Sequence, residues 1–228
     1  MKEFNPEIRN RIPLLFDLDG TLWDAREGIV ESWNTTFRKN GEPETVTIET
    51  LTPLLGQTTQ AFADAFLPIE DKERQSQIMD EVSRRENADL ERNKKYHLYP
   101  EVIETLRELS KTHWIGIVSN CEIGYIDIFV KAAHLEEVID GYLCFGDTKM
   151  PKSFTIRKLM KDNHLANGIY FGDTQGDKNA AQDAGLPFIW VKYGFGQNVE
   201  SKGLSSISDL VRDSQWTARI DQPLKTTE

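Results

Sequence analysis

Two aspartates separated by one leucine, Asp17 and Asp19, directly follow an apolar run that starts at Ile12. The stretch reads IPLLFDLDGTL, so two carboxylates stand at the edge of an expected core segment. Carboxylates this close repel each other, and one of them resists ionisation. The simpler interpretation is a turn at a strand end, in which Asp19 and Gly20 bend the chain. The alternative is a pair held for a cation and for chemistry, and its position after a buried run favours this alternative.

The chemistry that suits this pair is attack on phosphorus. One carboxylate, Asp17, would attack and become an aspartyl-phosphate, which is a form of covalent catalysis. Because an anion then approaches a phosphate dianion, a hard cation such as Mg²⁺ with oxygen ligands is expected. The second carboxylate, Asp19, would protonate the departing oxygen and then activate water. Its pKa, about 3.9 for a free aspartate, would be raised by the neighbouring carboxylate.

Two further stretches offer groups that hold a phosphoryl oxygen. In IVSNCE, Ser119 and Asn120 supply a hydroxyl and an amide, although helix capping is their ordinary role. In DTKMPKSFTIRKL, Lys152 would neutralise the phosphoryl group as a point charge. Lys149 lies three residues earlier and competes for the same role.

A fourth stretch, YFGDTQGDKNAA, delivers two more carboxylates after an apolar run. Asp173 is the natural ligand for the cation, because carboxylate oxygens suit Mg²⁺. Asp177 would orient metal-bound water or the lysine, and as a helix cap it would also have an ordinary structural role. Each stretch after the first is weak evidence for a catalytic site by itself. The prediction of such a site rests on the placement of all four stretches at successive strand ends.

The elements that position these residues follow from the hydrophobic pattern. Continuously apolar runs predict strands that are covered on both faces, at residues 12–16, 114–118, 168–171 and 188–191. Helical spacing follows between them, at residues 101–112, 124–135, 154–165 and 177–185. Alternating strands and helices predict an α/β fold with a doubly wound parallel, Rossmann-like sheet. Ligands of such sheets bind beyond the carboxyl ends of the strands, where the polar stretches lie.

Residues 25–95 interrupt this alternation. The stretch EGIVESWNTTFRKNG places Ile29, Trp33 and Phe37 on one helical face, and later segments also indicate helices without a convincing strand. We therefore expect a helical insertion over 25–95 and an α/β core formed by 1–24 and 96–228. The tail from about Asp213 is polar and indicates no element.

Composition excludes several classes of partner. The formal net charge of -10 disfavours a nucleic-acid backbone, although a cation and one lysine can reverse the potential locally. No apolar run approaches the roughly 20 residues of a membrane span. The two cysteines, Cys121 and Cys144, lack metal-type spacing and are expected as reduced core thiols. The first ten residues lack the pattern of a secretory signal, so a cytoplasmic location is expected.

With these motifs in place, the chain resembles the phosphatase branch of the haloacid dehalogenase (HAD) superfamily. FDLDGTL is similar to the first family motif, IVSN to the second and YFGDTQGD to the fourth. The resemblance implies that Asp17 is the nucleophile and Asp19 the acid and base. It also implies that Ser119 binds phosphate and that Asp17 and Asp173 bind Mg²⁺, with Asp177 as an acidic companion and the carbonyl of Asp19 as a further metal ligand.

The third motif departs from the commonest family pattern, in which a lysine would stand at Thr148. PKSFTI is similar to a rarer variant, which favours Lys152 over Lys149. The insertion resembles the helical cap of the family, which implies that the cap selects the substrate. Gly56 and Gln57 are candidates for that selection.

The basic cap residues are expected on a solvated helix face instead; they are Arg84, Arg85, Lys94 and Lys95.

The resemblance implies a Mg²⁺-dependent phosphatase for a small phosphorylated metabolite, of phosphoglycolate-phosphatase-like type. Dehalogenases of the superfamily lack the second aspartate, and no cap lysine has the apolar setting that a Schiff base requires. A sugar phosphomutase shares every core motif and stays open as an alternative. A phosphate-accepting signalling protein is a further alternative, although such receivers lack the second aspartate and the insertion. The sequence indicates neither the natural substrate nor the oligomeric state.

Overall fold

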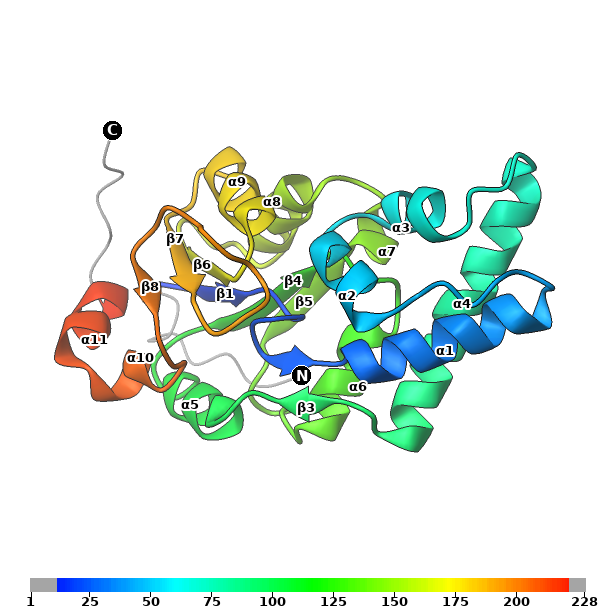
Figure 1. Ribbon diagram of the computed structural model, residues 1–228. Coiled ribbons are helices and arrows are strands. Elements are labelled where there is room, and N and C mark those ends of the chain that lie inside the picture. Colours follow the sequence, from blue (N-terminus) through cyan, green and yellow to red (C-terminus); the bar gives the residue numbers. More distant parts are fainter. Residues whose placement is uncertain (1–11, 222–228) are drawn as a thin grey trace.

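The structure, a computed structural model, describes residues 12–221 and centres on a six-stranded parallel sheet (Figure 1). The strand order is β5-β4-β1-β6-β7-β8. The strands are β1 (Leu14–Phe16), β4 (Ile115–Ser119), β5 (Gly141–Cys144), β6 (Ile169–Gly172), β7 (Phe188–Val191) and β8 (Gly203–Leu204). β1 pairs with β4 on one side and with β6 on the other, so further strands are added to the sheet on both sides of β1. The predicted doubly wound sheet is therefore confirmed.

Helices cover both faces of this sheet, which explains why its central strands are continuously apolar. Every residue of β1, β4 and β6 is buried. On one face, Leu15 and Tyr170 pack with α8 (Lys152–Asp162) and α9 (Gln175–Asp183). On the other face, Phe16 and Phe171 stack on each other and pack with α5 (Val102–Leu109) and α6 (Tyr125–Ala132). Figure 1 shows α8 and α9 on the side of the sheet opposite to α5.

The four predicted strands and the four predicted helices are present. The hydrophobic pattern did not predict the two strands at the outer edges of the sheet or the last helices. The edge strand β5 is only partly buried, so its sequence carries no continuous apolar run. At the opposite edge, β8 is two residues long. The tail from Asp213, which indicated no element, contains the helix α11 (Ser214–Asp221), whose Ile220 is buried. Two four-residue helices complete this part, α7 (Phe145–Thr148) and α10 (Asp209–Arg212).

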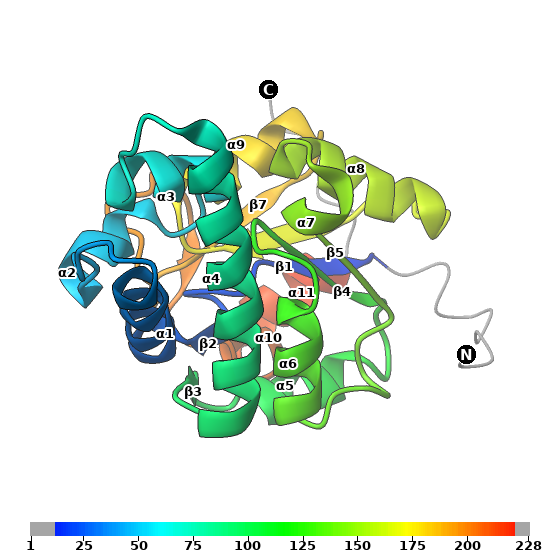
Figure 2. The same ribbon diagram turned by 90° about the vertical axis from the view of Figure 1, so that its right-hand side faces the viewer.

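A block of helices lies between two short strands, β2 (Trp23–Asp24) and β3 (His97–Leu98), which pair with each other in antiparallel fashion. The helices are α1 (Arg26–Lys39), α2 (Ile48–Leu51), the 3₁₀ helix η2 (Thr52–Leu54), α3 (Thr59–Phe66) and α4 (Lys72–Asn93). As expected, Ile29, Trp33 and Phe37 form the buried face of α1, and α1 packs against α4. Figure 2 looks onto this block, with α1 and α4 side by side in front of the sheet.

Within residues 12–221, no helix combines the length and apolar content that a membrane crossing requires. Cys121 and Cys144 are free thiols. The expectation about a secretory signal falls on residues that lie outside the described range.

Candidate active site

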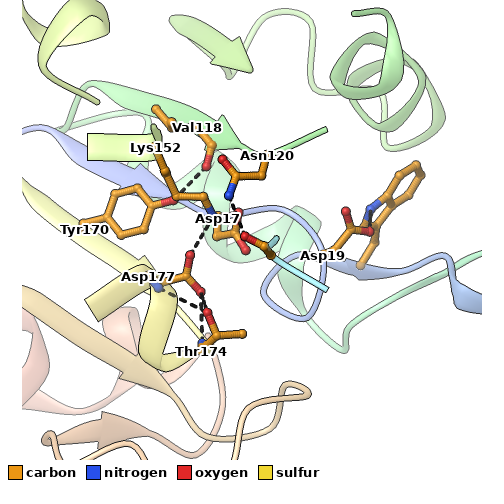
Figure 3. A network of polar contacts seen from close by, with 10 residues as sticks. Asp17, Asp19, Val118, Asn120, Lys152, Tyr170, Thr174 and Asp177 are labelled. Atoms are coloured by element: carbon orange, nitrogen blue, oxygen red, sulfur yellow. Dashed lines mark hydrogen bonds and ion pairs between the residues drawn. The ribbon is translucent and has the colours of Figure 1, made fainter. Parts of the chain in front are cut away.

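Polar residues at the carboxyl ends of β1, β4 and β6 lie next to one another. Asp17 follows β1 directly, Ser119 is the last residue of β4, and Asp173 follows β6 directly. All three residues are buried. Because β1 lies between β4 and β6, Asp17 lies between the other two residues. Figure 3 shows the polar network around it.

Lys152 joins two of the carboxylates. Its Nζ donates to Asp17 Oδ1 at 2.8 Å and to Asp177 Oδ1 at 2.6 Å, and its side chain is only 5% exposed. Burial lowers the pKa of Lys152, but the two carboxylates outweigh this effect and hold it well above its usual value. Lys149 is 61% exposed and pairs with Glu122 instead. The structure thus brings Lys152 to Asp17 and leaves Lys149 outside the network.

Asp177 has a second partner besides the lysine. Its Oδ2 accepts hydrogen bonds from the backbone N–H and the hydroxyl of Thr174, at 2.9 and 2.6 Å. The Thr174 hydroxyl in turn accepts from the N–H of Asp177, so the pair forms a capping box at the start of α9. Thr174, and not Asp177, is thus the N-cap residue of α9, and Asp177 completes the capping box from the third helical position while it also binds Lys152.

The two carboxylate oxygens of Asp173 differ in their contacts. Its Oδ2 accepts from the N–H groups of Phe195 and Gly196, at 2.6 and 3.0 Å, whereas its Oδ1 is buried without a hydrogen-bond partner. Burial, followed by the charge of Asp177, raises the pKa of Asp173 to about 7. A buried carboxylate oxygen without a partner is costly unless a ligand is bound.

A divalent cation fits these residues. One carboxylate oxygen from each of Asp17, Asp173 and Asp177 lies within 4.8 Å of the others. Burial and the charges of Asp177 and Asp173 raise the pKa of Asp17 well above its usual value, although Lys152 opposes this effect. A cation bound among these oxygens would offset their repulsion and provide the partner that Asp173 Oδ1 lacks.

Two glycines allow the chain to approach Asp173 closely. A Cβ on Gly20, whose φ is +82°, would lie 2.4 Å from Asp173 Oδ2. A Cβ on Gly194 would lie 2.3 Å from the Cβ of Asp173. The loop after β7, which includes the N–H donors of Phe195 and Gly196, was missed from the sequence. Its glycine-rich YGFG pattern was the available signal.

Asp19 faces away from the lysine network, as Figure 3 shows. Its Oδ1 accepts from Trp23 Nε1 at 2.9 Å and from the Tyr125 hydroxyl at 2.8 Å. Burial raises the pKa of Asp19 to about 6, these two hydrogen bonds lower it, and Asp24 raises it slightly. The expected rise is present, but its cause differs from the expected one: removal from water dominates, and Asp17 is not among the main contributors.

A cavity extends from these carboxylates toward the helical block. Its lining includes the predicted residues Asp17, Asp19, Gly56, Gln57, Ser119 and Asn120. The Asn120 side chain donates to the carbonyl of Gly56 at 2.5 Å, which connects the end of β4 to the loop after η2. Residues of α1, α3 and α4 form the far wall, among them Trp33, Phe62 and Glu86.

Comparison with known proteins places the chain in a family. The sequence profile of the haloacid dehalogenase-like hydrolases matches residues 14–191, which include all the motifs described above. The chain belongs to this family. A phosphoglycolate phosphatase from Rhodobacter capsulatus is 25% identical over 80% of this chain and 84% of its own length. A phosphoglycolate phosphatase from Agrobacterium fabrum is 29% identical over 79% and 80%, respectively. A haloacid dehalogenase-like hydrolase from Bacteroides fragilis shares the fold, with a TM-score of 0.76, 22% identity and coverage of 88% and 100%.

In this haloacid dehalogenase-like hydrolase, the four basic residues expected on a solvated helix face do not share one: Arg84 and the partly buried Arg85 lie on α4, whereas Lys94 and Lys95 follow its end at Asn93. Arg84 is exposed, Arg85 pairs with Asp89, and Lys95 pairs with Glu31. None of these cations lines the cavity, and neither does Lys94.

Sequence reasoning missed Trp23, Tyr125 and Glu86. Tyr125 begins α6 close after the second motif, which was a weak signal. Glu86 lies in a mostly polar helix, so nothing in its surroundings distinguished it from solvated residues.

Proposed function

We propose that this hydrolase is a Mg²⁺-dependent phosphatase that cleaves small phosphomonoesters through an aspartyl-phosphate on Asp17. The observation that carries the proposal is the buried Asp17–Lys152–Asp177 network beside Asp173, whose Oδ1 has no hydrogen-bond partner. Membership in the hydrolase family and the similarity to phosphoglycolate phosphatases support the phosphatase activity.

In the proposed reaction, an Asp17 oxygen forms a bond to phosphorus while the bond from phosphorus to the alcohol oxygen breaks. Asp19 gives its proton to that alcohol oxygen, because its carboxyl lines the cavity where the leaving group would lie. Asp19 then removes a proton from water, whose oxygen attacks phosphorus and releases phosphate and free Asp17. Trp23 and Tyr125 orient the Asp19 carboxyl throughout, through their hydrogen bonds to its Oδ1.

Other residues of the site hold charge in place during these steps. Lys152 neutralises the phosphoryl group, while Ser119 and Asn120 are proposed to bind its oxygens at the end of β4. Mg²⁺ would be held by the side chains of Asp17 and Asp173 and by the carbonyl of Asp19, and its positive charge would stabilise the phosphoryl oxygens. Asp177 keeps Lys152 directed toward Asp17.

We also propose that the helices within 25–95 act as a cap over the site. Gly56 and Gln57 line the same cavity as Asp17, and the bond from Asn120 to Gly56 joins the cap to the core. A cap in this position excludes water from the reaction and contacts the leaving group.

The test is hydrolysis of p-nitrophenyl phosphate by the purified protein, with Mg²⁺ and with the metal removed by a chelator. We expect phosphate release only with the metal, and a fall in kcat of about 10³-fold or more for Asp17→Asn, since that substitution removes the nucleophile. Asp183→Asn, at an exposed position on α9, is the matched control and should keep full activity. Equal, metal-independent turnover by the wild type and Asp17→Asn would contradict the proposal.

Acid quenching during turnover separates the alternatives. A phosphatase shows a short-lived phosphorylated species, together with stoichiometric release of phosphate. A phospho-adduct that persists for many minutes would instead indicate a phosphate-accepting protein. Transfer within a sugar phosphate, with little phosphate released, would indicate a phosphomutase.

A further inference from the structure

Apolar side chains from the helical block form much of the far wall of the cavity, together with polar residues such as Gln57, Thr59 and Asn87. Trp33 and Phe62 are in edge-to-face contact, with ring centroids 5.2 Å apart. The apolar residues that line the cavity are Ile29, Trp33, Leu51, Leu55, Phe62 and Met79. A leaving group bound between Asp19 and this wall would therefore contact mostly carbon atoms.

The ionisable side chains named among the lining of this cavity include four carboxylic acids and no basic group. Asp17, Asp19, Glu86 and Glu122 line it, and among the described residues no lysine, arginine or histidine does. Lys152 contacts Asp17 from outside the lining and is already paired with two carboxylates. An anionic group on the leaving group would thus be removed from water without a cation to pair with, which is costly.

Glu86 is fixed on this wall. Its Oε2 accepts a hydrogen bond from Trp33 Nε1, and Trp33 is itself held by aromatic contacts and is almost fully buried. Burial raises the pKa of Glu86 to about 8, the Trp33 hydrogen bond lowers it, and the charges of Asp19 and Glu122 raise it further. The field that disfavours a charge on Glu86 also disfavours a carboxylate on a bound substrate.

We propose that the substrate is the phosphate ester of a mainly apolar alcohol that carries no second anionic group, because among the described residues no cation lines the cavity that would hold the leaving group. The inference rests on the proposed phosphatase function. If the inference holds, phosphoglycolate is a poor substrate for this chain, because it carries a carboxylate beside its phosphate. The chain would then differ in substrate from the relatives that are named phosphoglycolate phosphatases.

The test compares three esters that differ only at the end remote from phosphorus. They are 2-phosphoglycolate, with a carboxylate; phosphoglycolamide, with an uncharged amide; and 2-aminoethyl phosphate, with an ammonium group. We expect kcat/KM for the amide and ammonium esters to exceed that for the carboxylate by about tenfold or more, mainly through KM. A preference for phosphoglycolate over its amide would overturn the inference.

Binding keeps this test separate from the test of the proposed function. Calorimetric titration of the Asp17→Asn variant with the amide and carboxylate esters measures the charge preference without turnover. If p-nitrophenyl phosphate is hydrolysed but the carboxylate ester binds more tightly than the amide, only the present inference fails. If no ester is hydrolysed, the proposed function fails, and the same titration still decides which end group the cavity accepts.

Discussion

Lys152 shows at the scale of one residue how burial changes what an ion pair contributes. Its ammonium group lies between Asp17 and Asp177, and all three side chains are at most 5% exposed. Lys149, three residues earlier, forms an ion pair of similar length on the surface. Removing one partner from a buried pair leaves a charge that water cannot reach, whereas an exposed charge is simply rehydrated.

We therefore predict that Lys152→Met lowers the free energy of unfolding by about 3–5 kcal/mol, because two buried carboxylates lose their cation. The matched variant Lys149→Met should change it by about 1 kcal/mol or less. Urea denaturation near neutral pH measures both values. Similar losses in the two variants would show that the buried network contributes no more than a surface pair.

Glu86 provides a prediction about pH. Its pKa is raised from 4.5 to about 8 in the folded protein, by burial and by Asp19 and Glu122. The folded state therefore keeps a proton that the unfolded state releases above its ordinary pKa. Ionisation of this group costs stability as the pH rises from about 4.5, and the full cost is reached near pH 8.

Glu86→Gln should remove this dependence. Between about pH 5 and pH 8.5, we expect the free energy of unfolding of Glu86→Gln to rise relative to the wild type by about 1–3 kcal/mol, a range reduced for the partial exposure of the site. Urea denaturation at both pH values gives the difference, with Glu91→Gln, at an exposed position on the same helix, as the control. A difference that stays constant between the two pH values would be evidence against a protonated Glu86.

At the scale of elements, the loop after β1 depends on a glycine. Gly20 has a φ of +82°, and its missing side chain leaves room for Asp173 from the loop after β6. Gly41 has a similar φ of +74°, but a Cβ there would meet nothing within 4 Å. Substituting each glycine in turn therefore distinguishes the cost of backbone strain from the cost of a clash at the proposed metal site.

We predict that Gly41→Ala costs only the left-handed backbone strain, about 1–2 kcal/mol. Gly20→Ala should cost more, since the added methyl group would lie 2.4 Å from Asp173 Oδ2. It should also abolish Mg²⁺-dependent hydrolysis, which Gly41→Ala should retain. Denaturation and p-nitrophenyl phosphate assays measure the two effects, and equal behaviour of the variants would rule out a steric role for Gly20.

At the scale of the whole molecule, the proposed cation couples the site to stability. Asp17, Asp173 and Asp177 come from two strand ends and one helix, so their mutual repulsion opposes the packing of these elements. A ligand that binds only the folded state stabilises it by mass action.

We predict that Mg²⁺ at about 100 times its dissociation constant raises the free energy of unfolding by about 2.7 kcal/mol, with a corresponding rise in Tm. Asp173→Asn should lose most of this rise, because its side chain retains only one carbonyl oxygen for the metal. The exposed variant Asp183→Asn should keep it. Thermal unfolding with and without Mg²⁺ measures the shift, and an equal shift in Asp173→Asn would place the cation elsewhere.

The local pattern of the sequence determined the central strands, the helices that follow them and the carboxylates at the strand ends. Continuous apolar runs are typical of strands buried on both faces, and a residue that follows such a strand must lie at its carboxyl end. The positions of Asp17, Ser119 and Asp173 could therefore be predicted without knowledge of any distant contact.

Only the tertiary structure decided which of two nearby lysines reaches Asp17, and it showed that Asp19 faces Trp23 and Tyr125. It also revealed the loop whose N–H groups bind Asp173. It placed Glu86 against Trp33, although the polar sequence of that helix predicts exposure to solvent. These features depend on residues far apart in the chain: Glu86 and Trp33 are 53 positions apart, and Lys152 and Asp17 are 135 apart. Burial is set by what packs against a residue, and a local sequence pattern does not contain that information.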